Sequence, residues 1–391
     1  MILKEKFLKF ILNPRYIFGV YLIIAVVTAI SKFLRGPQAI NNYLIFKNVF
    51  YNTLEQKNLY LQYPERYFDM NHYGVFFSLL IAPFAMMPDW LGISLWNVAN
   101  TAIFLFAIYK LPFSDAKKAL FALFCLQEYI TAAISLQFNI ALVGLLMLSA
   151  IYIYENKEVK SASAIVIGIF VKLYGIVGLS QFFFIKNKFK FILSGIIVAV
   201  ICLLIPMIYS TPQFVLQSYA DWSHSLISKN NDNQVLGNMQ DISLMGFVRR
   251  ILGDASISNL SFLAFGLPLF ALPYIRFKQY KNYAFQLMIL ASTLLFLVLF
   301  SSGSESPTYI IAVAGVMIWF FLQKERTPLV LGMLIFVIIL TCFSPSDLFP
   351  KSIKVNYIIK YSLKAVPCIV VWFRIIYELM TRDFEKDYSL Q

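Results

Sequence analysis

Ionisable side chains are scarce in this sequence, and a few of them stand where they could take part in acid–base chemistry. Asp69, His72 and Tyr73 gather just before a long apolar run, and Glu305 lies in the short polar segment 301–306. A carboxylate beside aromatic rings suits general-base catalysis or sugar binding. We take Asp69 as the first candidate base and Glu305 as the second, with His72 and Tyr73 as substrate-binding candidates. The simpler alternatives are a solvated acid in an interfacial aromatic belt and an acid favoured at a helix N-terminus.

Two further charged residues lie inside apolar runs. Glu128 stands within residues 119–134, and Lys172 is followed by Tyr174 and Gly175. An ionisable group at membrane depth is a functional candidate by default, because its burial is expensive. Lys172 could stabilise a phosphate leaving group. The alternatives are a structural hydrogen-bond network around Glu128 and a lysine that extends to the membrane interface.

Amides and arginines complete the substrate-binding candidates: Asn41, Asn42, Gln137, Asn139, Arg249 and Arg250. Asn41 and Asn42 precede aromatic residues at helical spacing, so either of them could instead cap an amphipathic helix on the membrane surface. Arg249 and Arg250 could grip a lipid phosphate or anchor their loop at the headgroups.

Metal ligands are few. His72 and His224 are the only histidines in the sequence, and they form no His-x-x-x-His pair. The four cysteines lie in apolar runs without metal-ligand spacing. We therefore expect no imidazole-held metal and no cofactor, while a carboxylate-held Mg²⁺ or Mn²⁺ stays open.

The composition indicates the class of fold that positions these candidate residues. Of 391 residues, 60% are hydrophobic and 14% are charged, whereas a soluble domain has about 45–50% and about 25%. We predict an all-α polytopic membrane protein, with residues 1–391 forming a single integral membrane domain. The net charge of +13 comes from basic clusters between apolar runs, which is typical of cytoplasmic loops and not of a nucleic-acid partner.

Apolar runs of about 20 residues predict transmembrane helices, because such a helix crosses the roughly 30 Å hydrocarbon layer. About twelve runs qualify: 16–35, 72–88, 90–111, 117–135, 139–154, 161–185, 191–209, 257–275, 282–301, 307–323, 328–345 and 356–379. The run 161–185 is ambiguous, since Lys172 and Gly175 could divide it into two half-helices. Between residues 72 and 185 the chain would then cross either five times or three times with a re-entrant hairpin.

Basic clusters predict the orientation. Residues 186–190, 276–281 and 324–326, the C-terminal tail, and the N-terminal Lys4, Lys6, Lys9 and Arg15 mark the cytoplasmic side. Both termini would be cytoplasmic in a plasma (inner) membrane. The two long loops, 36–71 and 210–256, would share the outer or periplasmic face, where their length favours loop helices and an active site.

Several short motifs, taken in order, resemble a known family. They are Leu59, Tyr60, Tyr63 and Pro64; Tyr73 and Gly74; Ile81 to Ala85; Gln137-x-Asn139; Lys172-x-Tyr174 with Gly175; and Ser304 to Thr308. Their order and their place on outer turns resemble the polyprenol-phosphate-mannose-dependent mannosyltransferases of glycosyltransferase family 87, in the GT-C superfamily. The resemblance covers most of the chain.

The resemblance implies a GT-C-like bundle and an inverting transferase. Such an enzyme moves a sugar, mannose or another hexose, from a polyprenyl-phosphate donor to a lipid or glycan acceptor outside the membrane. Lys172 and Tyr174 match the family's broken-helix motif, and Gln137 and Asn139 match its polar turn. Glu128 corresponds to a carboxylate upstream of that turn.

One position departs from the resemblance. The family usually has an Asp early in the first outer loop as the proposed base, and this sequence has Asn41 and Asn42 there. Two alternatives stand beside a transferase. One is a transporter or flippase of a polyprenyl-linked or other amphipathic substrate, which Glu128 and Lys172 would serve equally well. The other is a non-catalytic assembly partner.

Overall fold

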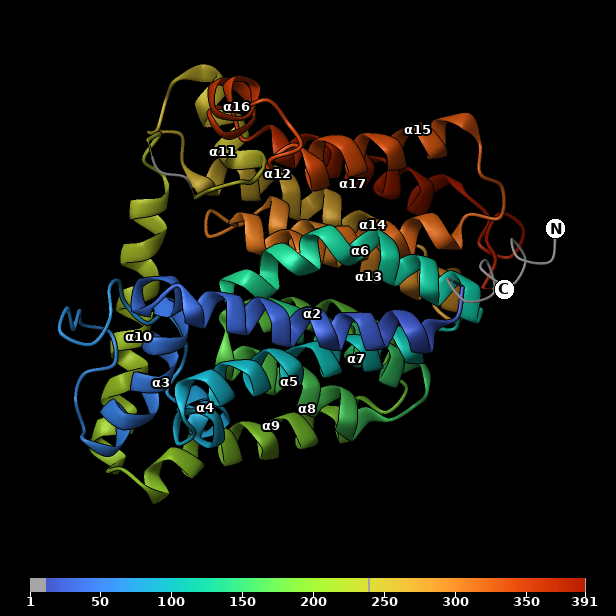
Figure 1. Cartoon of the computed structure of the whole chain (residues 1–391). Coiled ribbons are helices and arrows are strands. Elements are labelled where there is room, and N and C mark those ends of the chain that lie inside the picture. Colours follow the sequence, from blue (N-terminus) through green and yellow to red (C-terminus); the bar gives the residue numbers. More distant parts are fainter. Residues whose placement is uncertain (1–11, 238–239, 391) are drawn as a thin grey trace. The chain divides into compact units, whose positions relative to one another are not determined.

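The computed structural model describes residues 12–237 and 240–390, which form helices joined by loops of different lengths (Figure 1). No strand occurs among these residues, and an isolated bridge pairs Gln323 with Tyr388. The predicted all-α class is confirmed. Lys4, Lys6 and Lys9 lie outside the described residues. The chain divides into two compact units: unit 1 is Met1–Ile17, Leu111–Tyr129 and Lys229–Gln391, and unit 2 is Phe18–Lys110 and Ile130–Ser228.

Among the residues that the structure describes, four helices are long and apolar enough to cross a membrane by themselves. They are α2 (Pro14–Leu34), α5 (Asp89–Lys110), α6 (Asp115–Ser135), and α9 (Lys188–Leu204) continued by η3 (Ile205–Ile208). Each falls in a predicted run, because a continuous apolar stretch of this length has no other stable conformation in lipid. The multi-pass helical class is therefore confirmed, while the number twelve stays a prediction.

Unit 2 has a core built around Trp96 of α5. The rings of Phe46, Phe77 and Phe138 lie 5.6–6.2 Å from the Trp96 ring, and its indole N–H donates to the Leu136 carbonyl at 2.8 Å. The surrounding helices are η1 (Pro37–Ile40), α3 (Asn41–Leu54), α4 (Phe77–Ala85), α7 (Asn139–Tyr154), α8 (Glu158–Val171), η2 (Leu173–Phe184) and α10 (Pro212–Asn233). The last residues of α10 belong to unit 1.

The predicted span 72–88 is wrong. Only the nine residues of α4 are helical there, about 14 Å at 1.5 Å per residue, which is too short to cross the hydrocarbon layer. The preceding turn is held to the end of α8, because the Gly74 N–H donates to the Val171 carbonyl at 3.2 Å. A side chain at position 74 would put Cβ 2.4 Å from the Phe170 carbonyl oxygen, so only glycine allows this approach.

The run 161–185 is broken into two half-helices, as one of our alternatives predicted. Lys172 separates α8 from η2 and has an extended backbone, with φ −141° and ψ 119°. The two segments fold back on each other: Gly175 lies against Gly168, and Gly178 against Ile165. Lys172 therefore occupies the tip of a helical hairpin.

The predicted loop helix is present as α3, but the capping interpretation of its asparagines is wrong. Ile40 is the N-cap residue, and neither asparagine caps the helix. The side chains of Tyr43 and Phe46 are buried. The helix therefore packs its aromatic residues into unit 2 in place of presenting that face to a membrane surface.

Unit 1 packs α13 (Tyr283–Leu299), α14 (Tyr309–Leu322) and α17 (Val366–Thr381) against one another (Figure 1). Trp319 and Trp372 are fully buried there, and the Trp372 indole N–H donates to the Ser292 hydroxyl at 3.1 Å. The other elements are α11 (Leu244–Leu252), α12 (Asn259–Ala271), η4 (Leu272–Ile275), η5 (Phe277–Gln279), η6 (Ser306–Thr308), α15 (Pro328–Phe336), η7 (Val337–Phe343), α16 (Lys351–Ile353), η8 (Lys354–Ile359) and η9 (Leu363–Ala365).

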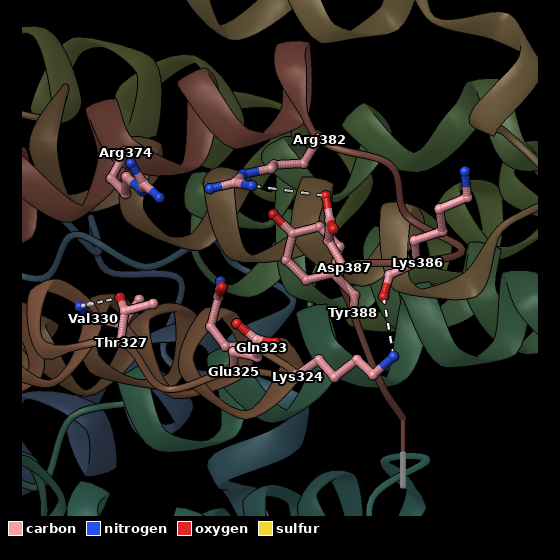
Figure 2. A pocket seen from close by; sticks show the side chains of 10 residues that line it. All are labelled: Gln323, Lys324, Glu325, Thr327, Val330, Arg374, Arg382, Lys386, Asp387 and Tyr388. Atoms are coloured by element: carbon pink, nitrogen blue, oxygen red, sulfur yellow. Dashed lines mark hydrogen bonds and ion pairs between the residues drawn. The ribbon is translucent and has the colours of Figure 1, made fainter.

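The C-terminal tail of unit 1 returns to the end of α14. The Lys324 N–H donates to the Asp387 carbonyl, and the Ser389 N–H donates to the Leu322 carbonyl at 3.0 Å. A pocket of about 170 Å³ lies between this tail and the ends of α14, α15 and α17 (Figure 2). Its lining residues are Gln323, Lys324, Glu325, Thr327, Val330, Arg374, Arg382, Lys386, Asp387 and Tyr388.

Candidate functional site

The hairpin tip in unit 2 brings together five predicted site residues, which we call the Lys172 cluster: Tyr73, Gln137, Asn139, Lys172 and Tyr174. The Lys172 ammonium donates to Asn139 Oδ1 at 2.8 Å, and the Asn139 amide donates to Gln137 Oε1 at 2.9 Å. The ammonium also lies 4.8 Å from the Tyr174 ring centre and 5.9 Å from that of Tyr73.

Local backbone features set this geometry. Leu136 has a left-handed backbone, with φ 61°, which turns the chain between α6 and α7 and places the fully buried Asn139 at the start of α7. The Tyr73 hydroxyl accepts from the Phe138 N–H at 3.3 Å, and the Tyr73 ring stacks on Phe77 with centres 4.9 Å apart. The aromatic core of unit 2 thus holds Tyr73 in place within the cluster.

The surroundings of Lys172 suit the binding of an anion. Its side chain is half-buried, and the contacts just described come from a neutral amide oxygen and two aromatic rings. Such groups favour a cation without cancelling its charge. An ammonium in this setting can bind a phosphate oxygen by a charge-assisted hydrogen bond.

His72 and Tyr60 tie the neighbouring segment to α10 and to the cluster. His72 Nδ1 lies 3.0 Å from the Ser225 hydroxyl, and the His72 carbonyl accepts from the Trp222 indole N–H at 2.9 Å. The buried Tyr60 hydroxyl donates to the Tyr73 carbonyl at 3.1 Å. Burial, with smaller effects from Tyr219 and Asp221, raises the pKa of Tyr60 well above its usual value.

Asp69, the first candidate base, follows a segment that Asn41 fixes. Asn41 Oδ1 accepts from the Phe68 N–H at 2.7 Å, and Asn41 Nδ2 donates to the Phe68 carbonyl at 2.6 Å. Asp69 is exposed, has a left-handed backbone with φ 73°, and accepts from the Met70 N–H at 2.8 Å. An amide can both donate and accept, whereas an ionised carboxylate only accepts. Asn41 therefore makes a paired contact that an Asp could not make.

Asn42 makes a different contact from its neighbour. Its side-chain amide donates to the Ser135 carbonyl at 2.7 Å, which connects the start of α3 to the end of α6 within unit 2. Both asparagines thus act through backbone groups of distant segments.

In unit 1, Glu128 forms an ion pair with a lysine that sequence analysis missed. The Lys364 ammonium donates to both carboxylate oxygens of Glu128, at 3.0 and 2.8 Å, and to the Ser306 hydroxyl at 2.8 Å. The side chains are 0% and 3% exposed. Lys364 also lies 4.8 Å from the Tyr309 ring centre. The three donors of the ammonium are thereby satisfied.

Glu305, the second candidate base, precedes Ser306 directly. It is half-buried at the N-cap position of η6, and its N–H donates to the Thr308 hydroxyl at 3.2 Å. Because Lys364 binds Ser306, the buried ion pair helps to fix the turn that carries Glu305.

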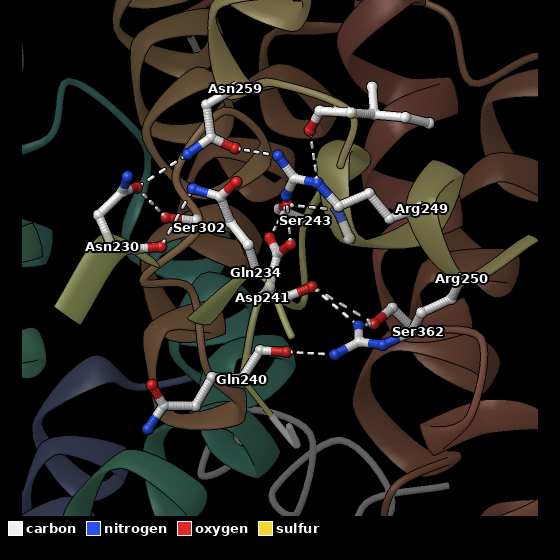
Figure 3. Close-up of polar contacts among 12 residues, drawn as sticks. Asn230, Gln234, Gln240, Asp241, Ser243, Arg249, Arg250, Asn259, Ser302 and Ser362 are labelled. Atoms are coloured by element: carbon white, nitrogen blue, oxygen red, sulfur yellow. Dashed lines mark hydrogen bonds and ion pairs between the residues drawn. The ribbon is translucent and has the colours of Figure 1, made fainter. Parts of the chain in front are cut away.

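Arg249 and Arg250 hold the 240–243 segment in place (Figure 3). Arg249, 1% exposed, donates to Asp241 Oδ2 and to the Ile257 carbonyl, at 2.8 and 2.9 Å, and to the Asn259 side chain. Arg250 donates to the Asp241 carbonyl at 2.9 Å and to the Ser362 hydroxyl. The network extends through Asn230, which accepts from Asn259 at 2.8 Å and from Ser302 at 2.6 Å.

Within residues 12–237 and 240–390, no group of three or more His, Cys, Asp or Glu side chains has the spacing to hold a metal ion. The expected absence of a cofactor stays a prediction.

These features define a helical multi-pass membrane protein with polar clusters at its loop ends. The sequence profile of glycosyltransferase family 87 matches residues 71–302, more than half of the chain. The chain therefore belongs to glycosyltransferase family 87 and is a membrane glycosyltransferase. The predicted family is confirmed. No curated protein sequence matches the chain.

A solved structure with a similar fold is described as ArnT from Cupriavidus metallidurans bound to undecaprenyl phosphate. The TM-score is 0.50 at 13% sequence identity, and the alignment covers 93% of this chain and 76% of that chain. This likeness supports the predicted GT-C-like fold.

The range matched by the family profile divides the candidate residues. It contains His72, Glu128, Arg249, Arg250 and all of the Lys172 cluster, whereas Asn41, Asn42, Asp69 and Glu305 lie outside it. Most substrate-binding candidates thus fall within the family's matched range, whereas Asn41, Asn42 and both candidate bases fall outside it.

Proposed function

We propose that this protein transfers a sugar, mannose or another hexose, from a polyprenyl-phosphate donor to a lipid or glycan acceptor on the outer face of the membrane. The observation that carries the proposal is the Lys172 ammonium at the tip of a broken helix, within the family's matched range. The similar solved structure is bound to undecaprenyl phosphate, which belongs to the same chemical class as the proposed donor.

Lys172 would act on the leaving group. As the bond between the sugar and the lipid phosphate breaks, negative charge develops on the phosphate, and a fixed ammonium lowers the energy of that state. Gln137, Asn139 and Tyr73 would orient the donor, with Tyr174 and His72 completing the site. Asn139 keeps Lys172 in place through its 2.8 Å hydrogen bond, so the cation needs little rearrangement during the reaction.

A carboxylate would take the proton from the acceptor hydroxyl, which then attacks the anomeric carbon with inversion. Asp69 is our first candidate for this base, since its side chain is exposed to an incoming acceptor. Glu305 is the second. Asn41 would act as a positioning residue, because its paired contact with Phe68 fixes the backbone that leads into Asp69.

Arg249, Arg250 and Glu128 fit positioning roles better than direct contact with the phosphate. All three guanidinium nitrogens of Arg249 already bind protein groups in unit 1. The Glu128 carboxylate is fully buried against Lys364. We propose that these residues hold the 240–243 segment and the Glu305 turn.

Charge distribution supports the proposed orientation. Basic clusters flank the ends of apolar helices that would face the cytoplasm, together with both termini. The loops that contain α3 and α10 would then face outward in a plasma (inner) membrane.

The test is a transfer assay with purified protein in detergent. The protein is incubated with a panel of radiolabelled polyprenyl-phosphate sugars and candidate acceptors, and labelled products are extracted. We expect release of the lipid phosphate with transfer of one sugar type. A transporter or an assembly partner would yield no product in detergent, and absence of product with every donor would contradict the proposal.

A further inference from the structure

We infer that the polar pocket of unit 1 binds the phosphate of an anionic phospholipid headgroup. The pocket lies between the C-terminal tail and the ends of α14, α15 and α17 (Figure 2). This inference depends on membrane insertion alone and not on the proposed sugar transfer.

The position of the pocket places it at headgroup depth. The helix α14 ends at Leu322, α15 begins at Pro328 and α17 ends at Thr381. Apolar helices therefore give way to polar segments around the pocket, which is where a membrane's hydrocarbon layer meets its headgroups. The Lys and Arg residues here, Lys324, Arg326, Arg382 and Lys386, predict that this is the cytoplasmic leaflet.

The lining is dominated by cations. It contains four basic side chains, Lys324, Arg374, Arg382 and Lys386, and two acids, Glu325 and Asp387. Two of these cations, Arg382 and Lys386, form ion pairs that are long and exposed to solvent. Arg382 lies 4.0 Å from Asp387, and Lys386, 83% exposed, lies 3.6 Å from Asp383. Such exposed ion pairs contribute little free energy, so a phosphate can take the place of their carboxylates.

A buried acid beside the pocket, Glu378, holds three of the lining side chains. The carboxylate of Glu378, 1% exposed, accepts from Arg374 Nε at 2.6 Å, from Gln323 and the Tyr388 hydroxyl at 2.9 Å, and from the Trp319 indole at 3.0 Å. The Glu378 carboxylate thus accepts hydrogen bonds from four side chains. These hydrogen bonds hold the side chains of Arg374, Gln323 and Tyr388 in place around the pocket.

The neighbouring surface favours a lipid over a soluble phosphate. Leu329 lies between the lining residues Thr327 and Val330 and is 55% exposed. Farther along α15, Leu331 and Ile335 are 40% and 53% exposed. The acyl chains of a lipid whose headgroup occupies the pocket would therefore meet apolar side chains.

The test compares lipid retention by the full-length protein in neutral detergent. Native mass spectrometry measures binding of phosphatidylglycerol and of phosphatidylcholine to the wild type and to the double variant Arg382→Gln/Lys386→Gln. The control is Lys278→Gln/Lys281→Gln, which removes the same charge from exposed positions outside the lining. Size-exclusion profiles verify that each variant is folded, and a parallel titration adds inorganic phosphate as competitor.

We expect the wild type and the control to prefer phosphatidylglycerol. The pocket variant should lose about tenfold in affinity for it, since each basic group near a membrane surface adds to the attraction of an anionic lipid. Equal retention by the pocket variant and the wild type would overturn the inference, as would equal binding of the two lipids. Full displacement by millimolar inorganic phosphate would overturn the assignment to a lipid and point to a soluble phosphate.

Discussion

Two lysines, one in each unit, show how the same side chain can occupy opposite environments. In unit 1, Lys364 is 3% exposed, and its three donors bind Glu128 and Ser306. In unit 2, Lys172 is half-buried at a hairpin tip and donates to the neutral amide of Asn139. Lys364 is paired with a carboxylate in the core of unit 1, whereas Lys172 contacts an amide oxygen and two aromatic rings at the tip of a hairpin.

This difference favours a structural role for Lys364 and a chemical role for Lys172. Removing one partner of a buried ion pair leaves an uncompensated charge, so the expected consequence is loss of stability. Removing a cation that stabilises a leaving group should slow the reaction and leave the fold intact. Variants of the two lysines should therefore fail in different ways.

The largest effect on stability is expected at the buried pair. Lys364→Met should destabilise the protein by about 3–5 kcal/mol, because Glu128 would remain buried without its partner. Thermal unfolding of the purified protein in detergent measures this. The double variant Glu128→Gln/Lys364→Met removes both charges and should recover most of the loss. A single variant as stable as the wild type would show that the pair does not stabilise unit 1.

A smaller effect on stability is expected at Gly175, next to the tip of the hairpin that presents Lys172. A methyl group at Gly175 would lie 2.4 Å from backbone atoms of Gly168 and Ile169, so Gly175→Ala must push α8 and η2 apart at a cost of about 1–3 kcal/mol. The displaced tip should lower transfer activity as well. Gly195→Ala is the control, since the nearest atom there is 4.0 Å away. Unchanged activity and stability in Gly175→Ala would contradict the hairpin packing.

The smallest effect on stability and transfer activity is expected from substitution of Asn41. Asn41→Asp keeps the size of the side chain and loses the donor to the Phe68 carbonyl, a change worth about 1 kcal/mol. We expect transfer activity to fall severalfold, to about the level of Asn41→Ala. An increase in activity would instead show that position 41 is the place of the base, and would remove Asp69 from that role.

Much of the fold was predictable from the sequence, because a helix that crosses a membrane needs a continuous apolar stretch, and such a stretch can be read directly from the sequence. Apolar length predicted α2, α5, α6 and α9, and Lys172 followed by Gly175 indicated the broken helix. The segment 72–88 was predicted wrongly because its apolar composition does not reveal that a turn at Gly74 is held against α8.

The site was predictable only where its residues lie in motifs. The members of the Lys172 cluster were named from their sequence patterns, and the structure brings all five together. Lys364 was missed because its partner Glu128 lies 236 residues away and no local pattern connects them. The contact of Asn41 with Phe68, 27 residues away, was hidden for the same reason.

The account depends on Lys172 acting as the cation for the lipid phosphate, and sugar transfer by Lys172→Gln tests this most directly. Labelled sugar transfer from the polyprenyl-phosphate donor is measured for wild type, Lys172→Gln and Lys172→Arg, each verified by its thermal unfolding midpoint. We predict that Lys172→Gln loses about 100-fold or more in kcat, with partial recovery in Lys172→Arg and little change in the midpoint. A folded Lys172→Gln variant that transfers sugar at the wild-type rate would contradict the account.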